Sequence, residues 1–192
     1  ALPISTVVSA TLIGFAKNKS GLITRSGARA GDLVFVTGAL GASTAGLKLF
    51  QKKLPGFPYE KGKHLRPAAR IDVSAKISKF ATAMEDVSDG LASEVRNICL
   101  ASRKGAVIFP EKIPIKESTF KAAAALGGNA RDYALFGGED FELVFTVDKK
   151  DESRARKFGA LVGEVNGESG KVFLSENGRR RRLKRFGFDH FP

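Results

Sequence analysis

Cysteine, tryptophan and long apolar stretches are what this sequence most lacks. The single cysteine, Cys99, excludes an internal disulfide framework and a cysteine-based zinc site, and it is typical of a small buried residue in a reducing compartment. No apolar run approaches the roughly 20 residues that cross a bilayer, and the first residues lack the basic region and apolar core of a secretory signal. We therefore expect a cytoplasmic protein without a membrane partner.

Acidic residues are outnumbered by basic ones. The sequence holds 32 Lys and Arg against 20 Asp and Glu, which gives a formal net charge of +12. Such a surplus suggests a nucleic-acid partner. However, half of it lies in residues 179–185, without a recognition helix, zinc finger or aromatic RNA-binding signature. A charge run beside Gly178 is more often a solvated turn, and a basic field serves phosphate-bearing substrates equally well. A basic nucleic-acid-binding domain is therefore the less favoured hypothesis.

The chain is long enough for one domain, or for one domain and a piece of another. With 43% hydrophobic and 27% charged residues it can form an ordinary core. Helical and strand-like segments alternate without a clean βαβ repeat, which predicts an α+β fold, a mixed sheet with helices packed on one face. Strands are expected at 4–16, 22–25, 33–38, 106–110, 160–165 and 171–174, with another ending at 147, and helices at 47–51, 71–83, 90–102, 120–126 and 151–158.

An acidic cluster interrupts an otherwise apolar stretch at residues 84–91. Asp86, Ser88 and Asp89 stand within four residues, and Gly90 follows them. The pattern suits a strand or loop that opens directly into a helix, and all three polar residues are good N-cap types. Carboxylate oxygens are also the ligands that Mg²⁺ prefers. The local sequence leaves a plain helix cap and a hard-cation site equally open.

Two other turns contain several glycines. Residues 38–46 form a small, glycine-rich link from a strand to a helix, a place where backbone N–H groups can bind phosphate. The link lacks the Walker ending, so close helix–sheet packing is the favoured interpretation. In the second turn, Gly137 and Gly138 let the backbone bend sharply while Glu139 and Asp140 point to one place. Taken alone, that turn would be an ordinary surface turn.

Six motifs stand in a defined order along the chain. They are Arg25-Ser26-Gly27-Ala28-x-x-Gly31-Asp32, Val36-Thr37-Gly38-x-Leu40-Gly41, His64-x-x-Pro67-x-x-Arg70, Asp86-Val87-Ser88-Asp89-Gly90-Leu91, Gly137-Gly138-Glu139-Asp140-Phe141-Glu142-Leu143 and Gly187-Phe188-Asp189-His190-Phe191. Together they resemble the thiamine-monophosphate kinase family, which belongs to the aminoimidazole-ribonucleotide-synthetase-like superfamily of ATP-dependent enzymes. One departure is Ala69, where that family usually has proline.

The resemblance implies a domain organisation. Family members are considerably longer and carry an N-terminal domain with further metal-binding aspartates. Residues 26–192 are therefore expected to form the C-terminal α+β domain, similar to that of aminoimidazole ribonucleotide synthetase. Residues 1–25 would be the last strands of a truncated N-terminal α/β domain that binds ATP and mediates dimerisation. We expect a homodimer at full length and little or no kinase activity from the chain alone.

The resemblance also implies a reaction, the ATP- and Mg²⁺-dependent phosphorylation of thiamine monophosphate to thiamine diphosphate. Asp86 and Asp89 would be the catalytic residues and the metal ligands, and Arg25 and Ser88 would bind ATP. Residues implied at the thiamine monophosphate side are Gly137, Gly138, Glu139, Asp140 and Phe188.

Other members of the superfamily remain alternatives. These are formylglycinamidine synthetase, selenophosphate synthetase and the hydrogenase-maturation enzyme. The motif at residues 187–191 favours the thiamine branch.

Overall fold

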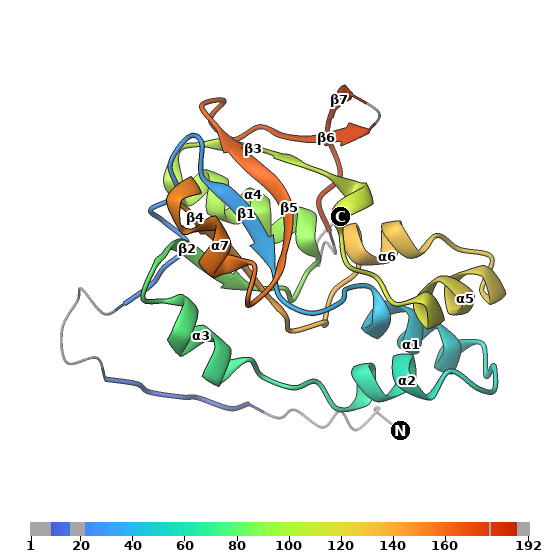
Figure 1. The fold of residues 1–192 in the computed structure, drawn as a ribbon. Helices are drawn as coiled ribbons and strands as arrows, with labels where there is room; N and C mark the ends of the chain where they lie inside the picture. Colours follow the sequence, from blue (N-terminus) through green and yellow to red (C-terminus); the bar gives the residue numbers. More distant parts are fainter. Residues whose placement is uncertain (1–8, 16–21, 177, 188–192) are drawn as a thin grey trace, which may run out of the picture.

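The computed structural model describes residues 9–15, 22–176 and 178–187 (Figure 1). Its centre is a seven-stranded sheet with the strand order β2-β4-β1-β5-β3-β6-β7. Neighbouring strands are antiparallel except β3 and β6, which are parallel, so the predicted mixed sheet is confirmed. The strands are β1 Leu33–Val36, β2 Ala81–Asp86, β3 Gly105–Ile108, β4 Leu143–Val147, β5 Ala160–Asn166, β6 Val172–Glu176 and β7 Arg179–Arg182.

Helices cover both faces of this sheet, whereas the sequence predicted one covered face. The α4 helix lies against one face, and α3 and α7 lie against the other (Figure 1). No helix of the described residues is long and apolar enough to cross a membrane. The helices are α1 Ala42–Gln51, α2 Pro58–Leu65, α3 Ile71–Ile77, α4 Leu91–Ser102, α5 Glu117–Ala125, α6 Ala130–Phe136 and α7 Glu152–Ala155, with 3₁₀ turns η2 Pro110–Lys112 and η3 Lys149–Asp151.

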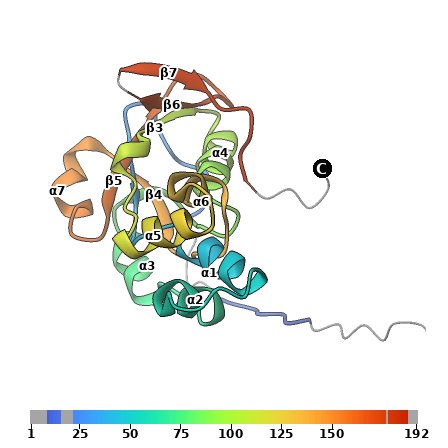
Figure 2. The same ribbon diagram turned by 90° about the vertical axis from the view of Figure 1, so that its right-hand side faces the viewer.

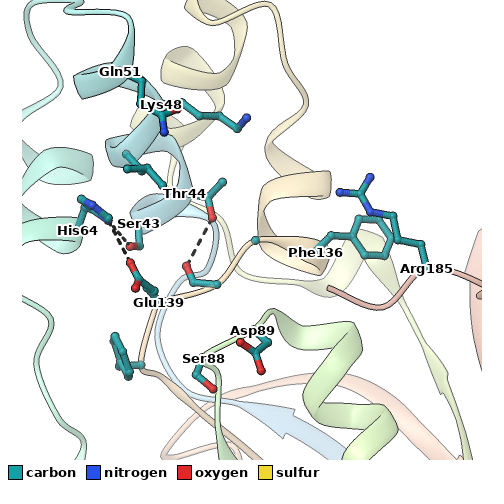
Figure 3. Close-up of a pocket in the computed structure, with 14 residues that line it drawn as sticks. Ser43, Thr44, Lys48, Gln51, His64, Ser88, Asp89, Phe136, Glu139 and Arg185 are labelled. Carbon is teal, nitrogen blue, oxygen red and sulfur yellow. Dashed lines mark hydrogen bonds and ion pairs between the residues drawn. The ribbon is translucent and has the colours of Figure 1, made fainter. Parts of the chain in front are cut away.

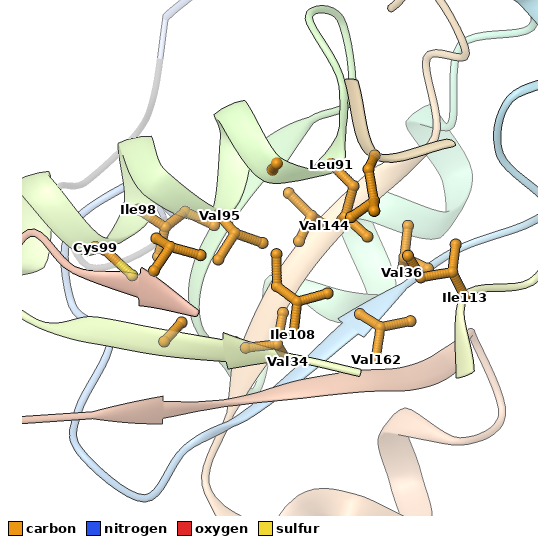
Figure 4. Packing of buried hydrophobic residues seen from close by; sticks show 14 of the residues in the cluster. Val34, Val36, Leu91, Val95, Ile98, Cys99, Ile108, Ile113, Val144 and Val162 are labelled. Atoms are coloured by element: carbon orange, nitrogen blue, oxygen red, sulfur yellow. The ribbon is translucent and has the colours of Figure 1, made fainter. Parts of the chain in front are cut away.

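The core follows from the two-residue period of the central strands. In β1, Val34 packs toward α4, while Phe35 packs on the opposite face, where its ring stacks on Phe145 at 5.6 Å between centroids. The α4 helix contributes one apolar stripe that includes Val95 and Cys99 (Figure 4). Cys99 is buried as predicted, and burial raises the pKa of its thiol to about 12.

A group of four helices, α1, α2, α5 and α6, lies beside the sheet and has a hydrophobic cluster of its own (Figure 2). Small residues bring α1 and α2 together, because a side chain at Gly46 would collide with the Glu60 carbonyl oxygen. This contact joins two helices, whereas the sequence predicted close helix–sheet packing at residues 38–46. The sequence patterns missed α2, in a stretch rich in Pro, Gly and Lys, and α6, which follows directly on Asn129.

Two segments differ from the predicted elements. The helix predicted at 71–83 ends at Ile77, and Ala81–Asp86 form β2, because pairing with β4 decides a segment whose apolar residues fit both periods. In residues 9–15 and 22–25, the described parts of the first two predicted strands, the chain forms no strand. Its contact with the sheet there includes one backbone bond, from Met84 N–H to the Thr24 carbonyl at 3.0 Å. The rest of the first predicted strand, residues 4–8 and 16, lies outside the described residues.

The arginine run also differs from the predicted solvated turn. Arg179–Arg182 form β7, which pairs antiparallel with β6 at the edge of the sheet (Figure 1). All four side chains are exposed, so the expected solvation holds although the turn does not.

Candidate functional site

The two acidic turns predicted from separate stretches lie side by side. Three backbone hydrogen bonds join them: Val87 N–H to the Glu142 carbonyl at 2.7 Å, Phe141 N–H to the Val87 carbonyl at 3.0 Å, and Glu139 N–H to the Ser88 carbonyl at 2.7 Å. The bonds continue beyond the paired ends of β2 and β4. The sheet therefore positions both motifs as one unit.

Two glycines make this close approach possible. Gly90 has a φ of 114°, and a Cβ there would lie 2.9 Å from the carbonyl oxygens of Leu135 and Gly137. A side chain at Gly138 would collide with the Ser88 carbonyl oxygen. Any larger residue at either position would push the two turns apart.

A cavity of about 530 Å³ opens where these turns face α1 and α2 (Figure 3). Ser88 and Asp89 lie on one side of it. Glu139 faces it near His64, and its carboxylate is 3.5 Å from His64 Nδ1. The opposite wall carries positive charge and aromatic surface, and its residues include Lys48, Phe136 and Arg185.

The two cations of this wall rest against aromatic rings. The Arg185 guanidinium lies 5.1 Å from the centre of the Phe136 ring, and Lys48 Nζ lies 5.6 Å from that of Tyr133. The sequence did not predict these two site residues, since each is one of 32 basic residues without a distinguishing motif. It also missed Ser43, whose hydroxyl lies 3.1 Å from His64 Nδ1.

The first turn does not cap α4 in the way that its residue types suggested. The helix begins after Gly90, without a capping hydrogen bond from the N-cap side chain. Instead, the buried Glu94 carboxylate accepts the Asp89 N–H at 2.7 Å and the Ser88 hydroxyl at 3.4 Å. Burial raises the pKa of Glu94 although the Asp89 N–H opposes this. The helix-cap alternative for Asp86, Ser88 and Asp89 is therefore wrong, and their side chains are not committed to capping.

Asp86 and Asp89, the two predicted metal ligands, lie in different surroundings. Asp89 lines the cavity, whereas Asp86 ends β2 and is exposed, outside the lining. Among the described residues, no group of three His, Cys, Asp or Glu side chains is placed to hold a metal ion. The two carboxylates have the right chemistry for Mg²⁺, but further oxygen ligands are needed from phosphate, water or other parts of the protein.

In the second turn, Asp140 is buried rather than facing the cavity. Its carboxylate accepts the Gly41 N–H at 2.6 Å and the Ser43 N–H at 3.1 Å, and so occupies backbone donors at the start of α1. Burial raises the pKa of Asp140 to about 6, although these bonds and Lys63 oppose the rise. The α1 N-terminus, considered above as a phosphate cradle, is thus occupied by a carboxylate of the protein itself.

Glu142 forms the most connected ionic contact of this region. It is 1% exposed and accepts hydrogen bonds from Arg70 Nε at 2.7 Å, Arg70 Nη2 at 2.6 Å, Lys63 Nζ at 3.1 Å and the Thr37 hydroxyl at 2.8 Å. Burial favours the neutral carboxyl, but these donors outweigh burial and lower the pKa of Glu142. Arg70, from the motif at residues 64–70, thus holds the motif at residues 137–143 in place.

The remaining predicted residues lie beside the cavity or outside the described chain. Arg25 Nε pairs with the buried Glu85 carboxylate at 2.5 Å and does not line the cavity. Burial, and next the neighbouring Glu94, raise the pKa of Glu85 to about 7. Phe188 lies outside the described residues. The residue before it, Gly187, packs so closely on the Asp89 carbonyl that a side chain there would collide with it.

Residues 29–174 match the family of AIR synthase related proteins, C-terminal domain. The chain belongs to this family. Its AIR synthase related domain is also similar to curated thiamine-monophosphate kinases. The Aquifex aeolicus kinase is 42% identical over 130 residues, which cover 66% of this chain and 42% of the relative. The Bacillus subtilis kinase is 36% identical over 200 residues, which cover 96% of this chain and 60% of the relative. The chain thus spans only about half of the length of such relatives.

Solved structures have the same fold. AaThiL complexed with AMPPCP and TMP has a TM-score of 0.77 and 37% identity, with 88% of this chain and 54% of that chain covered. A hydrogenase maturation protein has a TM-score of 0.73 at 19% identity, which shows a shared fold alone. The predicted α+β fold of the AIR synthase C-terminal type is confirmed.

Proposed function

We propose that this domain forms the C-terminal half of the active site of an ATP- and Mg²⁺-dependent kinase that converts thiamine monophosphate to thiamine diphosphate. One observation carries the proposal: the two acidic turns, tied by backbone bonds, face a single cavity that also holds Lys48 and Arg185. Similarity to thiamine-monophosphate kinases, and to AaThiL complexed with AMPPCP and TMP, supports this reaction over those of other family members.

Phosphoryl transfer needs neutralised charge and an in-line arrangement more than covalent help from the protein. Lys48 and Arg185 would offset the negative charge of the phosphates. The Ser88 hydroxyl would exchange its long bond to Glu94, at 3.4 Å, for a bond to a phosphate oxygen. Asp86 and Asp89 would be catalytic in this sense, as carboxylates that hold Mg²⁺. When bound, Mg²⁺ would neutralise the phosphate oxygens between which the group moves.

The substrate would lie against the Gly137–Gly138 backbone. The Glu139 side chain is 60% exposed and faces the cavity, where its charge would balance the positive ring of thiamine. Phe188 follows the segment packed on Asp89 and would stack on that ring. Asp140 would act on the substrate only through the start of α1. Arg25, whose side chain is 62% exposed, would contact ATP through its guanidinium.

The whole protein would be a cytoplasmic homodimer, with residues 1–25 as the end of an N-terminal domain that completes the metal site. The buried, unpaired Cys99 supports a reducing compartment. The motif resemblance and the greater length of the relatives support the second domain.

A coupled assay of ADP release by the complete gene product, with ATP and Mg²⁺, tests the proposal. We expect release only when thiamine monophosphate is added, and none with selenide or formylglycinamide ribonucleotide. A rate of ADP release that does not change when thiamine monophosphate is added would refute the proposed kinase activity. Residues 1–192 alone should show little or no turnover, and measurable turnover by them would contradict the division of the site between two domains.

A further inference from the structure

Resting on the proposed function, we propose that Glu94 is a positioning residue, whose buried carboxylate holds the Ser88–Asp89 turn so that the Asp89 side chain faces the cavity. None of the motifs above assigns a role to this residue. It lies in the first turn of α4 and is 1% exposed. Its carboxylate is directed back to the turn rather than out to solvent.

The contacts of Glu94 are divided between its two oxygens. Oε1 accepts the Asp89 N–H at 2.7 Å and the Ser88 hydroxyl at 3.4 Å, whereas Oε2 accepts from Asn97 Nδ2 at 3.0 Å. The first bond has the length of a charge-assisted hydrogen bond. It ties the backbone of Asp89 to α4, while the Asp89 carboxylate remains among the cavity residues (Figure 3).

Asn97, three residues later on the same face of α4, extends this contact to β2. Its side-chain amide also approaches Glu85 Oε1 at 3.4 Å, and Glu85 pairs with Arg25. An unbroken series of polar contacts thus runs from Arg25 through Glu85, Asn97 and Glu94 to the backbone of Asp89. Leaving a buried carboxylate without its hydrogen-bond donors costs free energy. The series therefore resists displacement of the turn.

A helix can be capped without this arrangement. A serine or aspartate side chain at the N-cap would bond the free N–H groups more simply, and the turn contains both residue types. Here Glu94 binds the N–H of Asp89, just before the helix, from inside the fold, so the Asp89 side chain need not turn inward. Glu94 therefore binds the backbone of the turn, and the Asp89 carboxylate stays free to face a ligand in the cavity.

The test uses the complete gene product with Glu94→Ala and Glu94→Gln substitutions. Glu117→Ala is the matched control, because Glu117 also lies in the first turn of a helix but its side chain is 82% exposed. For Glu94→Ala we expect faster amide hydrogen exchange in residues 86–91. We also expect kcat to fall by about 10-fold or more, with a several-fold higher Mg²⁺ requirement, since a misplaced group costs up to about 100-fold. Glu94→Gln keeps an acceptor for the Asp89 N–H and should lie between Glu94→Ala and the wild type.

A lower melting temperature with unchanged exchange, kcat and Mg²⁺ requirement would overturn the proposal, because Glu94 would then only stabilise α4. If Glu94→Ala does not fold, Glu94→Gln decides: a wild-type exchange rate and Mg²⁺ requirement would refute the positioning role. If the wild-type protein releases no ADP, the proposed function fails, while exchange of residues 86–91 in the variants still decides the role of Glu94.

Discussion

Residues 86–91 and 137–143 are both acidic turns beside glycine, yet the fold uses them in opposite ways. In the first turn, Asp89 lines the cavity and Asp86 is exposed, while a different residue binds the backbone. In the second, Asp140 and Glu142 are each 1% exposed and are bound by donors of the protein itself. The same residue types thus face a cavity or solvent in one turn and stabilise the fold in the other.

The number of hydrogen-bond donors that the protein itself offers a carboxylate decides whether that carboxylate can bind a ligand or only stabilises the fold. Glu142 receives four hydrogen bonds from Thr37, Lys63 and Arg70, which leave little capacity for a ligand. Glu139 has the opposite position in the same turn, 60% exposed at the cavity. Substitutions in the two turns should therefore separate activity from stability.

The largest effect is expected from Asp89→Asn in the complete gene product. Losing a charge that is proposed to hold Mg²⁺ should lower kcat by about 100- to 1,000-fold, as the loss of a group that stabilises transition-state charge does. The melting temperature should change by only a few degrees, because the side chain is not buried in the core. If Asp89→Asn keeps the wild-type kcat, Asp89 has no role in the proposed active site.

Next is Glu142→Gln, which leaves Arg70 and Lys63 without their counter-charge. Breaking a buried ion pair costs about 3 kcal/mol here, at the low end of the usual range because Arg70 is partly exposed. That cost corresponds to a melting temperature lower by about 6–12 °C. Thermal unfolding followed by circular dichroism measures it, with Glu139→Gln as a stability control expected within about 0.5 kcal/mol of wild type. Equal melting temperatures for the two variants would contradict the structural role of Glu142.

A smaller loss is expected from Asp140→Ala. Removing the acceptor of the Gly41 and Ser43 N–H groups should cost up to about 2 kcal/mol, as the loss of a strong helix cap does. Urea unfolding at neutral pH measures the free energy, and an unchanged m-value would show that the unfolded state is unaffected. A variant as stable as wild type would mean that water replaces the carboxylate at the start of α1.

The smallest effect is a difference in pH dependence within the second turn. The pKa of Asp140 is raised to about 6, so the stability that comes from protonating this buried carboxyl is full below about pH 4 and is lost as the pH rises through about 6. This is separate from the hydrogen bonds that the carboxylate accepts from Gly41 and Ser43. Glu142 has a lowered pKa, so its contribution is present above its unfolded pKa and is lost as the pH falls through the folded one. Melting temperatures at several pH values for Asp140→Asn and Glu142→Gln should diverge from wild type in opposite directions. Parallel curves would refute the assigned pKa directions.

The sequence predicted the sheet type, α4 and both acidic turns, because these depend on local periodicity and on glycines that stand next to carboxylates. It did not predict β2, since its apolar residues fit a helix until β4 pairs with them. It also could not separate Asp140 from Glu139, because the difference lies in Gly41 and Ser43, almost 100 residues earlier in the chain. The cavity cations were missed for the same reason: only folding brings Lys48 and Arg185 to one wall.

The ligand-induced rise in melting temperature tests the central comparison most directly. Mg²⁺ and ADP at about 100 times their dissociation constant should stabilise the complete gene product by about 2.7 kcal/mol. We predict that Glu142→Gln starts lower but keeps this rise, while Asp89→Asn starts near wild type and loses most of it. A full rise in Asp89→Asn, or its loss in Glu142→Gln, would contradict the assignment of the first turn to the ligand and of the second to the fold.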